Sequence, residues 1–222
     1  MWWNMAPEMR AEFEDWHSHE HFPERLCIPG FLRGSRWASV GEGDEGFFVL
    51  YELATYETLT SDPYLARLNA PTPWSRKMMP HHRNMVRSQC RVLETHGGGI
   101  AQSMATVRLS PNSGATQTLR DGLGNMLKTL PDIPGITGAH LLETHTPKIA
   151  ATTEQQIRGG GDAAADWILL VSGYDAVALS SVISRQFSEN SLMDRGAEPG
   201  HLAALYRLSY SATPVDFCDM QM

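Results

Sequence analysis

The sequence contains one short pattern twice, and this repetition constrains the fold more than any other feature. Residues 28–34 read Ile-Pro-Gly-Phe-Leu-Arg-Gly, and residues 133–139, which lie 105 positions later, read Ile-Pro-Gly-Ile-Thr-Gly-Ala. Pro-Gly pairs are common wherever a helix is followed by a strand, so turn chemistry alone could produce such a match. Each copy, however, lies between the first predicted helix and the second predicted strand of its half of the chain. The matched position predicts an internal repeat.

The first half alternates between helical and strand-like patterns. Met9, Phe13 and Trp16 recur at helical spacing, and Pro7 suits a first helical turn, so a helix is predicted from Pro7 to about Glu20. Aromatic and β-branched runs predict strands, whereas prolines break or end helices. The predicted order is a short opening strand at 2–5, the helix, a hairpin of strands at 31–40 and 47–53 with a glycine- and acid-rich turn at 41–46, a broken helix at 56–68, an irregular arm at 71–80 and a strand at 85–93.

The second half gives the same order of elements after the glycine triplet at 97–99. Strands are predicted at 100–109, 136–142, 167–171 and 202–210, helices at 116–130 and 176–187, and a loop in the polar stretch 148–165. Three consecutive glycines lose much entropy when they are ordered, so we place a linker there. The prediction is an N-terminal domain, 1–97, that carries the site, and a C-terminal domain, 98–222, that is mainly scaffold.

Two βαββαβ units define an α+β architecture. Each unit forms a four-stranded antiparallel sheet with both helices on one face, which leaves the other apolar face uncovered. The second unit can supply that cover. The two sheets are therefore predicted to close into a barrel-like sandwich within one chain, with room for a small ligand between sheet and helices.

Composition excludes several other classes. With 42% hydrophobic and 19% charged residues, the chain can build a core and is neither disordered nor a coiled coil. Its 18 Lys and Arg residues face 25 Asp and Glu residues, and a net charge of −7 argues against electrostatic binding to nucleic acid or anionic membranes. Neither is expected as a partner.

The cysteines and the apolar runs predict the cellular compartment of the protein. Cys27, Cys90 and Cys218 cannot all pair with one another and none has C-x-x-C spacing, so neither a disulfide framework nor a zinc site is predicted. No run approaches the ~18 apolar residues of a membrane span, and the first residues lack the pattern of a signal peptide. The expected location is cytoplasmic.

Histidine and tryptophan are concentrated in the first half, which favours a site there. If the first helix continues through His21, then His17 and His21 lie four residues apart on one face, a spacing that can hold a metal or pass a proton. A metal would need a third ligand, and the pattern does not match H-E-x-x-H, so no metal is predicted. His21 is predicted as a general acid/base, tuned by His17 or Glu20, because a free imidazole titrates near neutral pH. The alternative is a solvated polar helix end.

The segment 67–91 contains six basic residues and no acid. Arginine binds carboxylates in bidentate fashion and tryptophan stacks on rings, which favours an anionic, ring-bearing ligand. The candidates here are Trp74, His81, His82, Arg83 and Arg87. The alternative is that this basic face meets the acidic first helix within the fold or across a homodimer, which is the expected oligomer.

Three residues of the predicted hairpin could line a pocket. Arg33 and Trp37 lie on its first strand and Tyr51 on its second, where the tyrosine hydroxyl either enters a cavity or is a satisfied core group. The glycine triplets at 97–99 and 159–161 are not followed by the helix and lysine of a phosphate-binding loop, so no nucleotide cofactor is expected.

Several motifs resemble a known superfamily. These are Trp16 to Phe31, with the pattern W-x4-H-x-P-E-R-L-x-I-P-G-F, then 48–53, then Pro-Thr-Pro-Trp at 71–74 with Met-Pro-His at 79–81. Together they resemble the dimeric α/β-barrel superfamily, whose units are ferredoxin-like, in an uncharacterised branch close to the EthD-like and antibiotic-biosynthesis-monooxygenase-like proteins. The likeness covers residues 1–95 closely and the second half only by element order. It implies tandem ferredoxin-like repeats in a dimeric α/β-barrel-type sandwich.

The resemblance implies a function less firmly than a fold. Members include monooxygenases, muconolactone isomerases, polyketide cyclases and heme-binding chlorite dismutases. In the EthD-like branch a similar His-Pro segment would correspond to His21 and Pro23, with the imidazole facing the cleft. A heme would need a histidine from the second half, where His140, His145 and His201 have no supporting motif, so no cofactor is predicted.

The leading hypothesis is a cofactor-independent lyase, isomerase or cyclase that acts on a small aromatic or polyketide-like acid. His21 would move the proton, Arg33, Arg83 or Arg87 would hold the anion, and Trp37, Tyr51 and Trp74 would form the pocket walls. The alternatives are a cofactor-free monooxygenase and a non-catalytic ligand-binding or assembly protein of the same fold.

Overall fold

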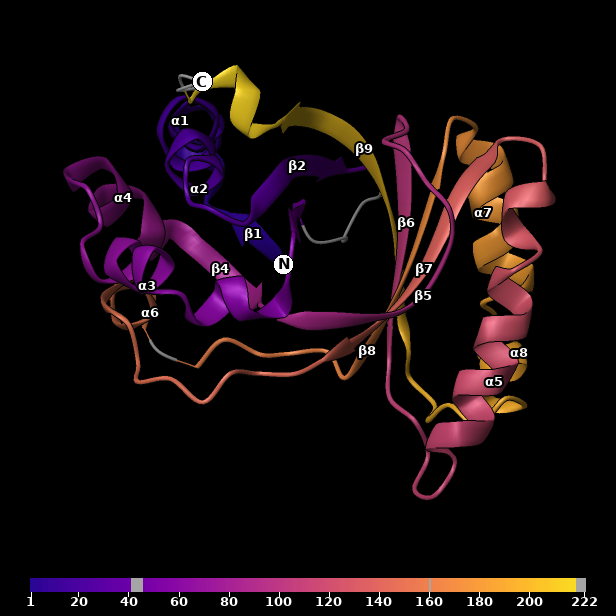
Figure 1. Cartoon of the computed structure of the whole chain (residues 1–222). Coiled ribbons are helices and arrows are strands. Elements are labelled where there is room, and N and C mark those ends of the chain that lie inside the picture. The colour runs from indigo at the N-terminus through magenta and orange to yellow at the C-terminus, as the bar shows by residue number, and fades with distance from the viewer. Residues whose placement is uncertain (41–45, 160, 219–222) are drawn as a thin grey trace.

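The computed structural model describes residues 1–40, 46–159 and 161–218, and within them the strands form one antiparallel sheet of nine (Figure 1). The spatial order is β4-β1-β3-β2-β9-β6-β8-β7-β5. The strands are β1 (Trp2–Met5), β2 (Phe31–Ser39), β3 (Phe47–Leu53), β4 (His82–Val86), β5 (Cys90–Gly97), β6 (Ser103–Leu109), β7 (Ile136–Thr144), β8 (Trp167–Gly173) and β9 (Leu202–Ala212).

The sheet consists of two copies of one topology. The order β4-β1-β3-β2 of the first unit recurs as β9-β6-β8-β7 in the second, which is the arrangement of a βαββαβ unit. Strands β2 and β9 pair from Gly34↔Ala212 to Ser39↔Tyr206 and join the units into one sheet. The predicted α+β fold of tandem ferredoxin-like units is confirmed.

The repeated Ile-Pro-Gly pattern has the same conformation in both units. Gly30 and Gly135 have φ angles of 96° and 97°, in a region that residues with a side chain rarely adopt. The Gly30 carbonyl accepts a hydrogen bond of 2.8 Å from Ala54 N, and the Gly135 carbonyl accepts one of 2.9 Å from Tyr174 N. Each glycine therefore closes the same turn at the far end of its hairpin.

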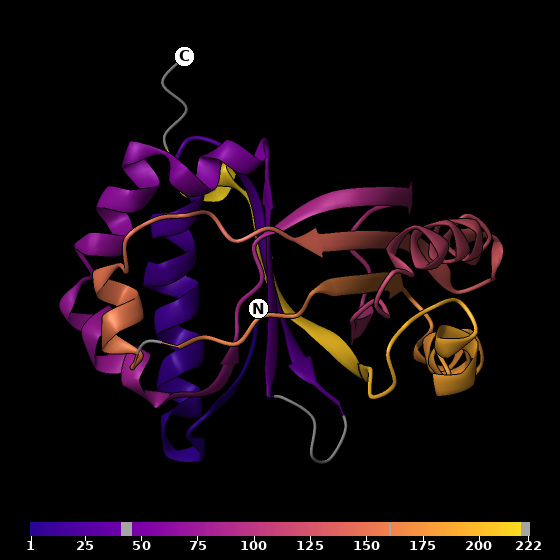
Figure 2. The same ribbon diagram turned by 90° about the horizontal axis from the view of Figure 1, so that it is seen from below.

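Helices cover one face of each unit (Figures 1 and 2). The first unit carries α1 (Arg10–Trp16), α2 (Phe22–Leu26), α3 (Asp62–Asn69) and α4 (Pro73–Met78), and the second carries α5 (Thr116–Leu127), α7 (Ala176–Arg185) and α8 (Glu189–Met193). Buried apolar side chains fill both layers.

A third core lies between the two faces that no helix covers. Trp2, Trp37 and Phe48 from the first unit pack with side chains that include Ile168 and Tyr206 from the second. The hydrogen-bonded β2–β9 pair closes one side of this sandwich. On the other side β4 and β5 are the two ends of the sheet and do not pair with each other. The predicted barrel-type arrangement is confirmed, and it is open along one side.

Several element boundaries differ from the prediction. The first helix does not end near Glu20 but passes through a π-helical turn at His17–His21 into α2, which includes Pro23. The arm at 71–80 is not irregular, because it contains α4 and a short 3-10 turn. The single strand predicted at 85–93 is two strands, β4 and β5. Residues 41–45 of the predicted acidic turn and residue 160 of the second glycine triplet lie outside the described residues.

Strand β5 precedes the glycine triplet at 97–99 but pairs with β7 of the second unit, from Cys90↔Thr144 to Gly97↔Gly138. The second sheet thus gains an edge strand from the segment that sequence patterns assign to the first domain. The division into 1–97 and 98–222 stays a prediction.

The connection between β7 and β8 crosses to the other unit. It carries α6 (Thr153–Ile157), which lies among α1–α4 and not beside α5 and α7 (Figures 1 and 2). The sequence predicts only a loop at 148–165. The second unit therefore contributes directly to the helical layer of the first.

Cys27 and Cys218 form a disulfide with a Cα–Cα distance of 5.8 Å, whereas Cys90 is free. The sequence-based conclusion that disulfides are unsupported is wrong for this pair, because tertiary folding brings the final 3-10 turn to the end of α2. No described helix is long and apolar enough to cross a membrane. Disulfides are rare in reducing compartments, so this pairing bears on the cytoplasmic location, which stays a prediction.

We expect Cys27→Ser to lower the free energy of unfolding by about 2–4 kcal/mol, because the bond closes most of the chain into one loop and restricts the unfolded state. Denaturant unfolding measures this, with Cys90→Ser as the matched control. Thiol titration of the denatured, unreduced protein should find one free thiol. Three free thiols, or equal stabilities of the two variants, would contradict the assignment.

Candidate functional site

The π-helical turn positions the histidines of the first helix. In this wider turn the Phe22 N–H donates to the His17 carbonyl, five residues back, and the next residue is Pro23, which has no N–H. The rings of His17 and His21 stack with centroids 5.3 Å apart, and His21 also lies 4.6 Å from the Trp16 indole. The predicted juxtaposition of the two imidazoles is present.

The hydrogen bonds of two histidines fix which nitrogen carries the proton. Arg36 Nη1 lies 3.4 Å from His17 Nδ1, and because a guanidinium only donates, His17 Nδ1 accepts and Nε2 holds the hydrogen. His82 Nδ1 lies 3.1 Å from the Met79 carbonyl, so Nδ1 donates and Nε2 keeps its lone pair. The site therefore contains one imidazole N–H donor and one imidazole acceptor.

All three imidazoles are held neutral. Burial, together with Arg36 and His82, lowers the pKa of His17 well below its usual value. Burial and then Arg25 do the same for the pKa of His21. Burial lowers the pKa of His82 to about 4, although its bond to the Met79 carbonyl opposes the shift. At neutral pH these rings can accept a proton.

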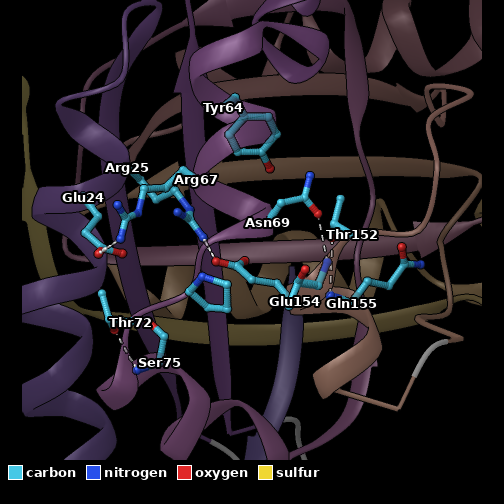
Figure 3. Close-up of polar contacts among 12 residues, drawn as sticks. Glu24, Arg25, Tyr64, Arg67, Asn69, Thr72, Ser75, Thr152, Glu154 and Gln155 are labelled. Carbon is cyan, nitrogen blue, oxygen red and sulfur yellow. Dashed lines mark hydrogen bonds and ion pairs between the residues drawn. The ribbon is translucent and has the colours of Figure 1, made fainter.

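Helix α6 closes the site from the second unit (Figure 3). Glu154 forms a buried ion pair with Arg25 of α2, with about 5% of each side chain exposed. The Thr153 N–H donates to Asn69 Oδ1 at 3.1 Å, and Thr152 caps the helix through Gln155 N. Neighbouring Arg67 and Glu24 pair at 2.5 Å. One buried charge pair thus holds the crossing segment against α2.

A small cavity of about 70 Å³ lies at the centre of these groups. Five polar atoms of residues that line it are buried without a hydrogen-bond partner in the structure: Trp3 Nε1, His21 Nδ1, Arg25 Nη1, Tyr51 Oη and Arg158 Nε. Buried polar groups are normally satisfied, so such a concentration indicates a place for a ligand or water. Two of the atoms are guanidinium donors, and burial raises the pKa of Tyr51, so its hydroxyl stays a donor. The cavity suits an oxygen-bearing, electron-rich group.

A second cavity, of about 830 Å³, lies between the two uncovered sheet faces on the open side of the barrel. It is lined by side chains of β3, β5, β7 and β8 and by the segment 87–91. The two cavities share five lining residues, which are Met1, Phe31, Tyr51, Tyr64 and Arg87. They therefore adjoin each other at one junction.

The structure gathers five of the predicted site residues around the small cavity. These are His17, His21, Tyr51, His82 and Arg87. Arg87 reaches the junction, where its Nη2 donates to the Tyr64 hydroxyl at 3.0 Å. Residues that are separated by up to 70 positions in sequence thus line one space.

The other six predicted residues lie elsewhere. Glu20 accepts bonds from Trp16, Thr72 and Ser75 and so braces α4. The Trp74 indole N–H donates a hydrogen bond to Glu12 at 3.1 Å. Trp37 is buried in the barrel core. Arg33 forms an ion pair with Glu52 at the larger cavity. His81 and Arg83 line neither cavity.

Sequence reasoning missed Arg25, Glu154 and Arg158. Arg25 stands in the pattern P-E-R-L that carries the family likeness, so it could have been considered. Glu154 and Arg158 lie in a polar stretch of the second half, and nothing in their local pattern indicates that α6 crosses to the first unit. Their contribution depends on tertiary structure alone.

The described residues contain no group of three His, Cys, Asp or Glu side chains that could hold a metal ion. Of the three histidines of the second half, one of which a heme would need, His140 lines the larger cavity, whereas His145 and His201 line neither cavity. His145 pairs with Glu143 at 2.6 Å, His201 with Glu189 at 2.9 Å, and His140 contacts Thr95. The layer between the second sheet and its helices is filled by packed apolar side chains.

Comparison with solved structures identifies the class of fold. No protein-family model matches the sequence, and no curated protein is significantly similar to it. Thirty-six solved chains match in structure, and those below are similar over nearly the whole chain. They share the ferredoxin-like, dimeric α/β-barrel type of architecture that the sequence analysis predicts.

Three of these structures define the likeness. An anthrone oxidase-like protein superposes with a TM-score of 0.63 at 11% identity, covering 100% of this chain and 94% of its own. A proposed monooxygenase from Fusobacterium nucleatum gives 0.60 at 7% identity over 95% and 91% of the chains. One from Lactobacillus acidophilus gives 0.57 at 10% identity over 96% and 93%. At such identities the likeness shows the fold alone.

We expect Glu154→Gln to lower the free energy of unfolding by about 3–5 kcal/mol, because it leaves the Arg25 charge buried without its partner. Glu57→Gln is the control, since Glu57 forms an exposed pair with Arg91 that should contribute less than about 1 kcal/mol. Urea unfolding of both variants measures the difference. Equal effects would mean that α6 is not held by this ion pair.

We also expect acid to destabilise the fold through the buried imidazoles. A histidine whose folded pKa lies below 6.5 binds more protons when unfolded, so its contribution is complete above pH 6.5 and is lost as the pH falls toward the folded value. For His82 the window runs from 6.5 to about 4, with a loss of up to about 3 kcal/mol.

Unfolding free energies at several pH values test this expectation. His82→Gln should flatten the slope between pH 6.5 and 4, whereas His19→Gln, at an exposed ring, should leave it unchanged. A slope that is identical in both variants would show that His82 titrates normally.

Proposed function

We propose that the protein is a cofactor-independent enzyme that removes a proton from a small aromatic or polyketide-like acid, with His21 as the proton acceptor. The observation that supports this most is the group of five buried polar atoms without partners around the small cavity. A non-catalytic binding protein of the same fold would have no need for a neutral imidazole among them.

The chemistry follows from the charges around the cavity. A neutral imidazole can take a proton from a carbon next to a carbonyl, and the C–H electron pair then moves onto the carbonyl oxygen as an enolate. Arg25, Arg158 and the Tyr51 hydroxyl are donors that would stabilise this oxyanion in a site largely shielded from water. His17 and His82 would stay uncharged beside His21, and His21 would remain able to accept a proton.

The fate of the enolate distinguishes the two reaction classes. Return of the proton to another carbon, or loss of a leaving group, makes the enzyme an isomerase, cyclase or lyase. The second candidate is a monooxygenase, which the similarity to an anthrone oxidase-like protein and two proposed monooxygenases favours. In that case O₂ converts a CH₂ group to a carbonyl, and its second oxygen atom leaves as water.

We expect His21→Ala to abolish turnover while the melting temperature stays nearly unchanged, because the ring is stacked on Trp16 but makes no hydrogen bond through Nδ1. Deuterium exchange at the acidic carbon of anthrone and of aromatic β-keto acids, followed by NMR in D₂O without oxygen, measures the proton step for either class. His19→Ala, on the same helix but exposed, is the matched control.

The pH profile provides an independent check. Because the base stays unprotonated well below pH 6.5, exchange should not decline between pH 8 and pH 6.5. Equal exchange by His21→Ala and the wild type would refute the assignment. Adding O₂ then separates the candidates, since only a monooxygenase consumes it.

A further inference from the structure

We propose that the barrel interior is itself a ligand site, which binds the elongated apolar body of a carboxylic acid whose head group is held by Arg87 and Gln89. The identification of this acid as the substrate rests on the proposed function, whereas its binding does not. The site lies on the opposite face of the sheet from the histidines.

The size and the walls of this cavity suit an apolar body. Its volume of about 830 Å³ lies in the range of ligand pockets, ~300–1,000 Å³. Trp2 and Phe48 line it from the first unit, and Leu142, Ile168 and Leu170 line it from the second. All five are at most 9% exposed. The two units thus present facing apolar walls that do not fill the space between them.

The polar part of the lining includes Arg33, Glu52 and His140, and two further hydrogen-bond donors lie two residues apart in the chain, at Arg87 and Gln89. Gln89 is 8% exposed, lines the cavity, and its Nε2 is buried without a partner in the structure. Arg87, two residues earlier in the chain, lines both cavities, and no carboxylate among the described residues pairs with it. An uncompensated guanidinium and an amide N–H are the donors that a carboxylate accepts. A ligand without an acceptor oxygen would leave both donors unused, and a charged carboxylate binds a guanidinium more strongly than a neutral acceptor does.

The junction connects these two donors with the histidines. Because Arg87, Tyr51 and Tyr64 line both cavities, a carboxylate bound at Arg87 lies beside the small cavity while its chain extends into the barrel. β1 pairs with β3 at Trp2↔Phe48 and Trp3↔Phe47, and Met1 exchanges hydrogen bonds with Val49, so this pairing ends before residues 50–53 of β3. The preferred ligand is thus an acid with one long apolar chain or fused ring system attached to it.

Isothermal titration with straight-chain acids of six to twelve carbons tests the proposal on the wild-type protein. Each added methylene should tighten binding about fourfold, the equivalent of ~0.8 kcal/mol, until the cavity is filled. Naphthoic and anthracene carboxylic acids form a second arm that separates fused-ring from alkyl ligands. An affinity that is independent of chain length and ring size would overturn the proposal.

Two variants locate the site. Arg87→Gln should weaken acids roughly tenfold and leave the corresponding methyl esters unchanged, with Arg185→Gln, at an exposed position of α7, as control. Leu170→Phe should narrow the cavity and lower the affinity for the longest acid, whereas Val177→Phe, on the surface of α7, should not. If Leu170→Phe does not fold, Leu142→Phe replaces it. If Arg87→Gln still discriminates between acids and their methyl esters as the wild type does, the ligand binds elsewhere.

The same titrations on His21→Ala distinguish this inference from the proposed function. Binding that persists while proton exchange is lost supports both. Chain-length dependence with undiminished exchange in His21→Ala would refute the proton acceptor but not the ligand site. Exchange that depends on His21 without any chain-length dependence would refute the ligand site alone.

Discussion

The structure depends on the uncovered face of each βαββαβ unit. Helices pack on one side of such a sheet, and the apolar side chains of the other side need a second layer to exclude water. Here the second unit provides it, and the β2–β9 ladder fixes the relative position of the two sheets. A full strand ladder closes only one side of the sandwich, whereas on the other side β4 is joined to the second unit by a single bridge at Val86↔Ala163. The core is dense around Trp37 and Tyr206 and hollow near β5. The cavity is a consequence of this one-sided closure.

Much of the fold could be predicted from sequence because local signals agreed with the global arrangement. The Ile-Pro-Gly repeat marked equivalent turns, and the alternating runs at 31–39 and 47–53 became strands at those places. Predictions failed where tertiary contacts overrode local signals. Pro23 normally ends a helix, but a π-helical turn beside the aromatic core lets α2 continue to Leu26. The link between Cys27 and Cys218 depends on where the chain returns, which no spacing rule describes.

The residues of the candidate site were likewise predictable from sequence only in part. His17 and His21 were recognisable because helical spacing alone brings them together, and His82 followed from the density of histidines in one half. Arg33, Trp74 and Arg83 were chosen for residue type, yet Arg33 and Trp74 are bound to Glu52 and Glu12. Arg83 lines neither cavity. Arg25, Glu154 and Arg158 were missed since their proximity arises from a crossing segment of the second unit.

The crossing segment that carries α6 explains how the site can contain charged groups and still be shielded from water. Burying Arg25 beside three imidazoles would be costly if its charge were uncompensated, and Glu154 supplies the compensation from outside the first unit. The pair satisfies one side of the guanidinium and leaves Nη1 facing the cavity. The same cation, near but not bonded to His21, disfavours protonation of that ring. A duplicated chain can place a carboxylate there without altering the repeat that carries the histidines, so the second unit contributes more than support to the first.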